Sequence, residues 1–388
     1  MDFTEPTERQ AIRDAVRDLC ARYPDEYWRD LDRRSAYPEE FVKALTDAGW
    51  LAALIPTEFG GGGLGMAQAS VILEEINGSG GNAASAHAQM YTMGTLLRHG
   101  SDAQKKRVLP RLAKGELRLQ AFGITEPDAG SETTRIRTVA QLRGDGYVVN
   151  GKKIFISRTL QSDLLLLLAR TTPYDDVADK TQGLSVFLVD LKTAVAKKQI
   201  TIRPIETMLN HHTTELFIDG LELSADDLVG SEGHGFRHII DSWNAERILI
   251  ASESLGDGRW FVERAAAYAS KRVVFGRPIG ANQGVQFPIA QAQAQLVAAG
   301  LVRDKAAWLF DAGKPSGAEA NTAKLLASQA AWAAGNAAMD AYGGYAYATE
   351  FDVERKFRET RLYLTAPVSN NLVLAYIAEH VLGLPKSY

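Results

Sequence analysis

The chain has 388 residues, of which 46% are hydrophobic and 23% are charged, and its formal net charge is −4. This composition is typical of a soluble globular protein with two or three cores, and no basic excess indicates a nucleic acid or an anionic membrane surface as a partner. The single cysteine, Cys20, excludes disulfides within the chain and argues against zinc–thiolate sites, so we expect it on the buried face of a helix.

Hydrophobic periodicity divides the sequence into three blocks. Residues 1–118 predict a helical N-terminal domain, as in "PEEFVKALTDAGWLAAL" and "DAQKKRVLPRLAKGEL". Residues 119–226 are rich in short apolar runs and predict an antiparallel β-barrel or sandwich, with a turn at Asn150-Gly151. Residues 227–388 predict a C-terminal four-helix bundle with Ala-rich, closely packed faces. The fold class is therefore α+β.

Neither a membrane segment nor a targeting segment is evident in the sequence. The longest apolar run, "DLLLLLAR", is too short to cross a bilayer and reads as a buried strand. The first residues, "MDFTEPTERQ", have neither an apolar signal core nor a transit-peptide composition, so a cytoplasmic location is expected.

Three motifs occur in order along the chain: "FGITEPDAGSETTRIRT" at 122–138, "ASKRVVFGRPIGANQGVQ" at 269–286 and "YGGYAYATEFDVERKFRETRLY" at 342–363. Together they resemble the acyl-CoA dehydrogenase family over essentially the whole chain. The resemblance implies that family's fold, FAD as cofactor and oxidation of an acyl-CoA thioester to the trans-2-enoyl-CoA. It further implies a place in fatty acid β-oxidation, an electron-transferring flavoprotein as acceptor and a homotetramer built as a dimer of dimers.

The resemblance also assigns binding residues. The residues that it places at FAD are Phe122, Ile124, Thr125, Phe155, Ser157, Arg272, Phe275, Gln283, Gly343, Gly344, Ser369 and Asn371. The residues that it places at the substrate are Tyr91, Ser131, Trp243, Asn244 and Arg247. Each also has an ordinary structural interpretation, such as a capped β-turn for the first motif, a solvated helix-end charge for Arg272 or a C-cap for the two glycines.

The catalytic base needs a separate argument, because the loop position that carries a glutamate in much of the family is Pro367 here. Isovaleryl-CoA and long-chain acyl-CoA dehydrogenases instead place the base on a helix, just before an arginine, and Glu246 precedes Arg247 in "SWNAERILIASESLG". Glu246 shares one helical face with Trp243, Arg247 and Ile250, by their spacing. We therefore predict Glu246 as the base, against the alternative of a solvated glutamate. An apolar cavity would raise its pKa.

Pro367 also removes a hydrogen-bond donor. In the family, the backbone N–H at this position and a ribityl hydroxyl of the flavin hold the thioester oxygen, and proline has no N–H. The N–H of Val368 or another donor must replace it, or the reaction must need less enolate stabilisation. Two alternatives therefore stay open: an acyl-CoA desulfinase or flavin oxidase on the same fold, and a catalytically weak flavin- or CoA-binding protein.

The sequence gives partial information on the substrate. Family members that take a dicarboxylic acyl chain can have an arginine where this chain has Ala84, so a substrate with a free carboxylate is disfavoured. His211 and His212 are adjacent; read as a strand, they point to opposite faces and have no third ligand nearby, so no metal site is predicted.

Overall fold

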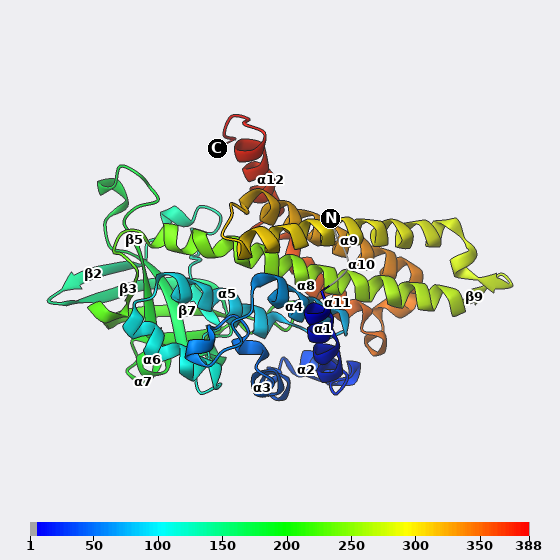
Figure 1. The fold of residues 1–388 in the computed structure, drawn as a ribbon, viewed down its shortest axis with the longest axis horizontal. Helices are drawn as coiled ribbons and strands as arrows, with labels where there is room; N and C mark the ends of the chain where they lie inside the picture. The colour runs from blue at the N-terminus through cyan, green and yellow to red at the C-terminus, as the bar shows by residue number, and fades with distance from the viewer. Residues whose placement is uncertain (1–5, 388) are drawn as a thin grey trace. The chain divides into compact units, whose positions relative to one another are not determined.

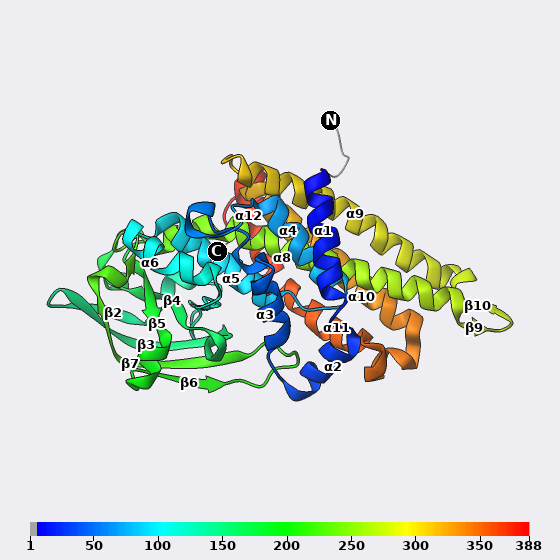
Figure 2. The same ribbon diagram turned by 60° about the horizontal axis from the view of Figure 1, so that its bottom comes forward.

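The computed structural model describes residues 6–387, with helices toward both ends of the chain and a sheet in the middle, as the sequence predicts (Figures 1 and 2). The α-helices are α1 (Thr7–Cys20), α2 (Asp25–Arg34), α3 (Glu39–Asp47), α4 (Met66–Gly78), α5 (Ala84–His99), α6 (Asp102–Ala113), α7 (Leu191–Ala196), α8 (Gly235–Lys271), α9 (Gln283–Asp311), α10 (Gly317–Tyr342), α11 (Val353–Arg361) and α12 (Asn370–Tyr376). The strands are β1 (Ala121–Gly123), β2 (Val139–Arg143), β3 (Gly146–Ser157), β4 (Leu164–Arg170), β5 (Leu184–Asp190), β6 (Ile200–Pro204), β7 (Thr213–Ser224), β8 (Leu228–Val229), β9 (Val273–Val274) and β10 (Arg277–Pro278). Among residues 6–387, none of the helices combines the length and the apolar character that crossing a membrane requires.

The chain packs into two compact units. Residues 42–63 and 84–243 form one, which contains the large sheet and is called the sheet unit below. Residues 6–41, 64–83 and 244–387 form the other, called the helical unit. The three-part division after residues 118 and 226 stays a prediction.

The large sheet has eight strands in the order β6-β7-β3-β2-β4-β5-β8, with β1 beside β4. Most neighbours are antiparallel, but β1 and β2 run parallel to β4. The sheet is therefore mixed rather than purely antiparallel as predicted, because β1 pairs with a strand that follows the β2–β3 hairpin instead of with its sequence neighbour.

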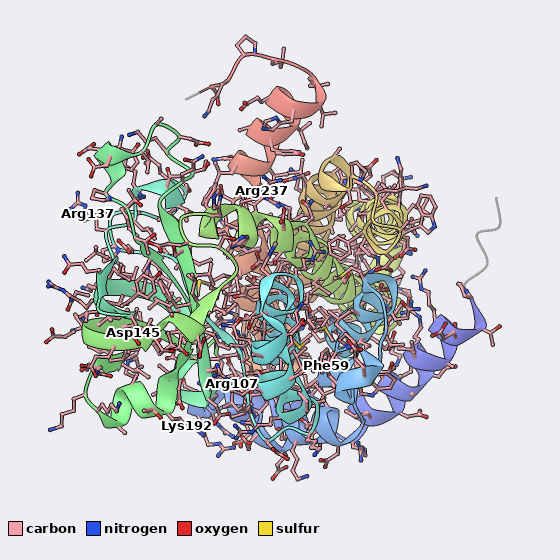
Figure 3. The ribbon with its side chains drawn as sticks, turned by 60° about the vertical axis from the view of Figure 1, so that its left-hand side comes forward. Phe59, Arg107, Arg137, Asp145, Lys192 and Arg237 are labelled. Carbon is pink, nitrogen blue, oxygen red and sulfur yellow. The ribbon has the colours of Figure 1, made fainter. Side chains whose placement is uncertain are left out.

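The turn predicted at Asn150-Gly151 is wrong, since β3 runs through both residues. The hairpin reverses instead at Gly144 and Asp145, where Gly144 has a φ of 62°, and Asp145 is labelled in Figure 3. At Asn150 the β3–β7 ladder shifts register, and the Asn150 side chain accepts a hydrogen bond from the Gly220 N–H at 2.8 Å. Pairing with β7 thus outweighs the local turn preference.

The run "LLLLLAR" forms β4, which is buried along its whole length. Its side chains alternate between two cores: Leu165 and Leu167 pack with residues of β3, β6 and β7, and Leu166 and Leu168 pack with residues of α5 and α6. Both faces of the strand are therefore covered, which explains an apolar run without alternation.

Small residues allow the helices of the helical unit to pack closely. The buried side of α10 consists largely of alanines, and α9 and α10 pack against each other. At Gly256 of α8, a Cβ atom would lie 2.3 Å from the carbonyl oxygen of Glu74 in α4. Cys20 lies on the buried face of α1, as predicted.

Candidate active site

A buried ion pair holds the first motif in the sheet unit. Lys153 on β3 is 0% exposed, and its Nζ donates to the Ile124 carbonyl at 3.0 Å and to Glu126 Oε1 at 2.8 Å. The Glu126 carboxylate also accepts the N–H groups of Arg137 at 2.6 Å and Thr138 at 2.9 Å. Burial alone would raise the pKa of Glu126, but the ammonium of Lys153 and these donors lower it. Neither residue was among the predicted site residues, although "TEP" and "KKIF" contain them.

The β1 segment and β3, each of which carries a predicted cofactor residue, meet beside this ion pair. The Ile154 N–H donates to the Thr125 carbonyl at 2.9 Å, so the end of the β1 segment lies against β3. The next residue, Phe155, has a φ of 58° at an irregularity of the β3–β7 ladder, and its ring is 62% exposed. A left-handed, exposed aromatic residue is strained, and such strain is typical of functional sites. Ser157 follows at the end of β3, paired with Thr213.

The predicted wall of the acyl pocket lies on α5. Tyr91 stacks on Phe122 of β1, with ring centroids 6.3 Å apart, and His87 contacts Tyr91 edge-on at 5.3 Å. The structure thus joins one predicted substrate residue to one predicted cofactor residue. The two other predicted substrate residues of this unit are Ser131, which is exposed, and Trp243, which is half-buried on α8.

His211 and His212 lie in the loop before β7, so the strand predicted for them is wrong. The Arg158 N–H donates to the His212 carbonyl at 2.9 Å, and its guanidinium lies 3.3 Å from Nδ1 of His211. Burial and this guanidinium hold the pKa of His211 well below its usual range. His211 is therefore a neutral partner of Arg158. Among residues 6–387, the structure contains no group of three or more His, Cys, Asp or Glu side chains able to hold a metal ion.

Glu246 and Arg247 lie on α8 in the helical unit and are 7% and 9% exposed. The Arg247 guanidinium donates to Asn244 Oδ1 at 3.4 Å. Burial lowers the pKa of Arg247, and the carboxylate of Glu246 acts in the opposite direction. The helix therefore carries a buried carboxylate beside a buried cation.

The loop that carries the base in much of the family spans Thr365–Ser369 here. It contains no carboxylate, and a cis peptide bond joins Ala366 to Pro367. Ser369 caps α12 by accepting the Leu372 N–H at 3.4 Å. Asn371, the other cofactor residue predicted here, is exposed on the first turn of α12.

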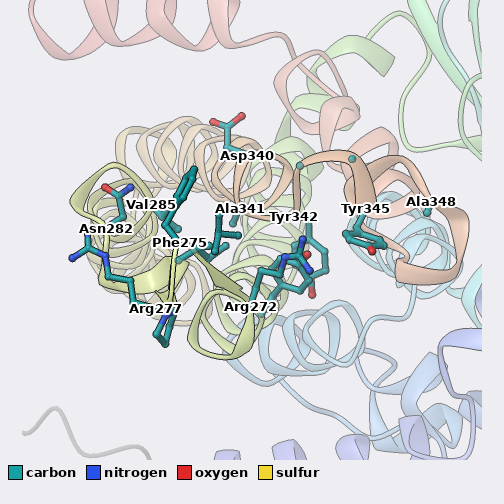
Figure 4. Close-up of a pocket in the computed structure, with 16 residues that line it drawn as sticks. Arg272, Phe275, Arg277, Asn282, Val285, Asp340, Ala341, Tyr342, Tyr345 and Ala348 are labelled. Atoms are coloured by element: carbon teal, nitrogen blue, oxygen red, sulfur yellow. The ribbon is translucent and has the colours of Figure 1, made fainter.

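A cavity of about 760 Å³ lies in the helical unit, between the end of α8 and the segment after α10 (Figure 4). Four predicted cofactor residues line it: Arg272, Phe275, Gly343 and Gly344. A further cofactor residue predicted from the second motif, Gln283, is exposed at the start of α9 and directly follows Asn282, which lines the cavity.

This cavity fits one end of a flavin dinucleotide. Phe275 has a φ of 51° and is 101% exposed, so its ring is held away from the protein's own core. Gly343 has a φ of 57°, and a Cβ atom on either Gly343 or Gly344 would meet open space. A bare backbone beside the Arg272 guanidinium suits a phosphate group, and the exposed ring suits a planar base. In the sheet unit, the exposed ring of Phe155 suits a planar flavin ring, and Thr125 offers polar groups to its edge.

Comparison with known families covers nearly the whole chain. Residues 6–116 match the model of the acyl-CoA dehydrogenase N-terminal domain, residues 121–221 the middle domain and residues 233–382 the C-terminal domain. The acyl-CoA dehydrogenase FadE12 of Mycobacterium tuberculosis is 36% identical over 100% of this chain and 99% of its own. The chain belongs to the acyl-CoA dehydrogenase family. It is an FAD-dependent oxidoreductase that dehydrogenates acyl-CoA thioesters.

Solved structures agree with this assignment of the family. A glutaryl-CoA dehydrogenase in complex with glutaryl-CoA is 31% identical and has a TM-score of 0.91, over 100% of this chain and 98% of its own. A structure described as the electron transferring flavoprotein of Acidaminococcus fermentans is 27% identical with a TM-score of 0.91, over 98% of this chain and 100% of its own. The fold predicted from the three motifs is therefore confirmed.

Proposed function

We propose that Glu246 is the base that removes the α-proton of the acyl-CoA. The observation that carries this proposal is that Glu246 is a buried carboxylate on α8, whereas the loop Thr365–Ser369 contains no carboxylate. After this loop the next carboxylate is Glu379, which lies beyond α12 in the helical turn Ile377–Val381.

When bound, FAD would supply the acceptor for the β-hydrogen, which leaves the substrate as hydride. Glu246 takes the α-proton onto its carboxylate, and Trp243, Asn244 and Arg247 contact the CoA arm, with the Arg247–Asn244 hydrogen bond fixing the direction of the guanidinium. Ser131 and Tyr91 contact the thioester arm and the acyl chain. Since Pro367 cannot donate, the N–H of the next residue is the backbone donor that we propose for the thioester oxygen.

We propose that twelve residues of the chain bind FAD, with Arg272, Phe275 and Gln283 reaching the FAD of a neighbouring subunit. In the sheet unit these are Phe122, Ile124, Thr125, Phe155 and Ser157. In the helical unit they are Arg272, Phe275, Gln283, Gly343, Gly344, Ser369 and Asn371. The left-handed conformations of both phenylalanines and the open backbone at the glycine pair support this assignment.

The acyl group that we propose is uncharged. Ala84 stands at the start of α5, where some relatives with dicarboxylic substrates have an arginine. The nearest cation on this helix, Arg98, donates to the backbone carbonyl of Asp241, which engages its guanidinium. A glutaryl chain would therefore lack the partner for its distal carboxylate that an arginine at position 84 would supply.

The chain is proposed to form a homotetramer. Four large apolar residues of α9 are 54% to 58% exposed and lie on one side of the helix: Phe287, Val297, Leu301 and Trp308. An exposed apolar stripe of this kind marks a protein–protein interface. An electron-transferring flavoprotein as acceptor, a role in β-oxidation and a cytoplasmic location belong to the same proposal. The similarity to the Acidaminococcus fermentans structure supports the acceptor.

Anaerobic titration tests the assignment of Glu246. Short, branched, medium, long and dicarboxylic acyl-CoAs are added to the FAD-loaded enzyme while the visible absorbance of the flavin is followed. We expect one uncharged acyl-CoA to bleach the wild type, and Glu246→Gln to slow bleaching by about 10²–10⁴-fold, as for other general bases. Glu379→Gln is the matched control and should bleach at the wild-type rate. Undiminished bleaching by Glu246→Gln would exclude it as the base, and oxygen uptake or sulfite release would indicate the alternative chemistries.

A further inference from the structure

Lys324 is a buried cation that the assignments above do not use. It lies on α10 and is 0% exposed. Its Nζ donates to the Val368 carbonyl at 2.6 Å and to Asn370 Oδ1 at 2.7 Å. Both acceptors follow Pro367 in the chain. One ammonium group therefore holds the end of the loop Thr365–Ser369 at Val368 and the start of α12 at Asn370. Hydrogen bonds from a charged donor are about twice as strong as neutral ones.

A second side chain of α10 supports the same contact. Asn370 Nδ2 donates to Ser328 Oγ at 3.1 Å, which fixes the orientation of the amide that Lys324 contacts. Ser328 stands one helical turn after Lys324, so the two act from the same side of α10. The loop is thus bound to α10 at its exit, through Val368 and through the first residue of α12.

The position of this contact matters because of Pro367. The first backbone N–H after the proline belongs to Val368, and Lys324 binds the carbonyl of the same residue. Fixing that carbonyl limits rotation about the Val368 backbone and thereby limits the directions in which its N–H can point. Lys324 is also close enough to Arg247 for the two cations to interact: burial and then Arg247 lower the pKa of Lys324 to about 8. The contact therefore lies near the residue that follows Glu246.

We propose that Lys324 is a positioning residue, which holds the end of the loop Thr365–Ser369 and the start of α12 so that the Val368 N–H can serve the thioester oxygen in place of the donor missing at Pro367. The inference rests on the proposed site at Glu246 for the place of the reaction, but the loop contact itself does not depend on which residue is the base. It explains how a proline is accommodated at this position of a functional dehydrogenase.

The test compares Lys324→Met with wild type as FAD-loaded enzyme, by hydrogen exchange and by steady-state kinetics with the acyl-CoA that bleaches best. We expect faster amide exchange in residues 368–372, while amide exchange in α10 itself is unchanged. We also expect kcat to fall by about tenfold to hundredfold, because a displaced donor is lost mainly in the transition state, with KM and FAD content little changed. Lys305→Met, which removes an exposed lysine of α9 paired with Glu319, is the matched control and should change neither quantity.

Two further variants cover the case in which Lys324→Met fails to fold. Asn370→Ala removes one acceptor and keeps the cation, so exchange in the loop should rise; Asn370→Asp keeps the acceptor and should restore both exchange and kcat. Unchanged loop exchange with unchanged kcat would overturn the proposal, and so would exchange that rises equally throughout α10. Exchange is also measured in Glu246→Gln, so a wrong base and a wrong loop contact give separate results.

Discussion

Replacing Lys153 by methionine tests whether the buried ion pair holds the segment Ile124–Glu126 in the sheet unit. The change keeps most of the side-chain volume and removes the ammonium from a site that is 0% exposed. Two hydrogen bonds are lost, one to the Ile124 carbonyl and one to Glu126. The carboxylate is then buried without its cation.

The expected cost follows from these contacts. Breaking a buried ion pair by removing one partner costs about 3–5 kcal/mol. Glu126 keeps two backbone donors, those of Arg137 and Thr138, so we expect the lower end of this range, about 3 kcal/mol. Since about 1.4 kcal/mol corresponds to a factor of ten, the open state of the segment should become about a hundredfold more populated.

Hydrogen exchange at Ile154 measures this population directly, because its N–H donates to the Thr125 carbonyl. We expect exchange about a hundredfold faster in Lys153→Met, together with weaker FAD binding. Lys152→Met is the matched control: Lys152 is 40% exposed, and losing its pairing with Glu215 should change exchange at Ile154 little. A change of less than about threefold in Lys153→Met would refute the reasoning, since it corresponds to well under 1 kcal/mol.

The pH dependence of the same contact has a defined sign. The pKa of Glu126 is lower in the folded state than its ordinary value of 4.5. Its contribution to stability is therefore present above that ordinary value and is lost as pH falls through the lowered folded pKa. The difference in stability between wild type and Glu126→Gln should shrink over this acidic range, and a difference that stays constant would contradict the assignment.

Three further predictions use other parts of the molecule. Burial raises the pKa of Cys20 to about 12, so an alkylating reagent at mildly alkaline pH should modify it only after unfolding, and rapid labelling of native protein would contradict its burial. Leu301→Glu places a charge in the apolar stripe of α9 and should shift sedimentation toward smaller species, whereas an unchanged profile would remove this stripe from the interface. Gly256→Ala places a Cβ atom 2.3 Å from the Glu74 carbonyl oxygen and should destabilise the protein by about 1–3 kcal/mol in thermal unfolding. Gly300→Ala, with open space around the new atom, is its control and should not destabilise; equal effects would show that packing is not the cause.

The sequence by itself determined the order of helices and sheet, because hydrophobic periodicity is a local property of the chain. It also determined the family, because the three motifs lie in fixed order and each combines several residue types. The adjacency of Glu246 and Arg247 on one helix was likewise readable from the sequence, since helical spacing fixes which side chains are neighbours.

Only the tertiary structure decided the contacts that join distant segments. Asn150-Gly151 is a turn sequence, but pairing with β7 keeps it within a strand. The partners of Lys153 and Lys324 are 27 and 44 residues away, respectively, and depend on which strand or loop packs against the one that carries the lysine. A buried lysine has no sequence pattern of its own, because its burial is tolerated only where acceptors from elsewhere in the fold reach it. The local sequence therefore fixed the residues available for catalysis, and packing between segments decided which cations hold them in place.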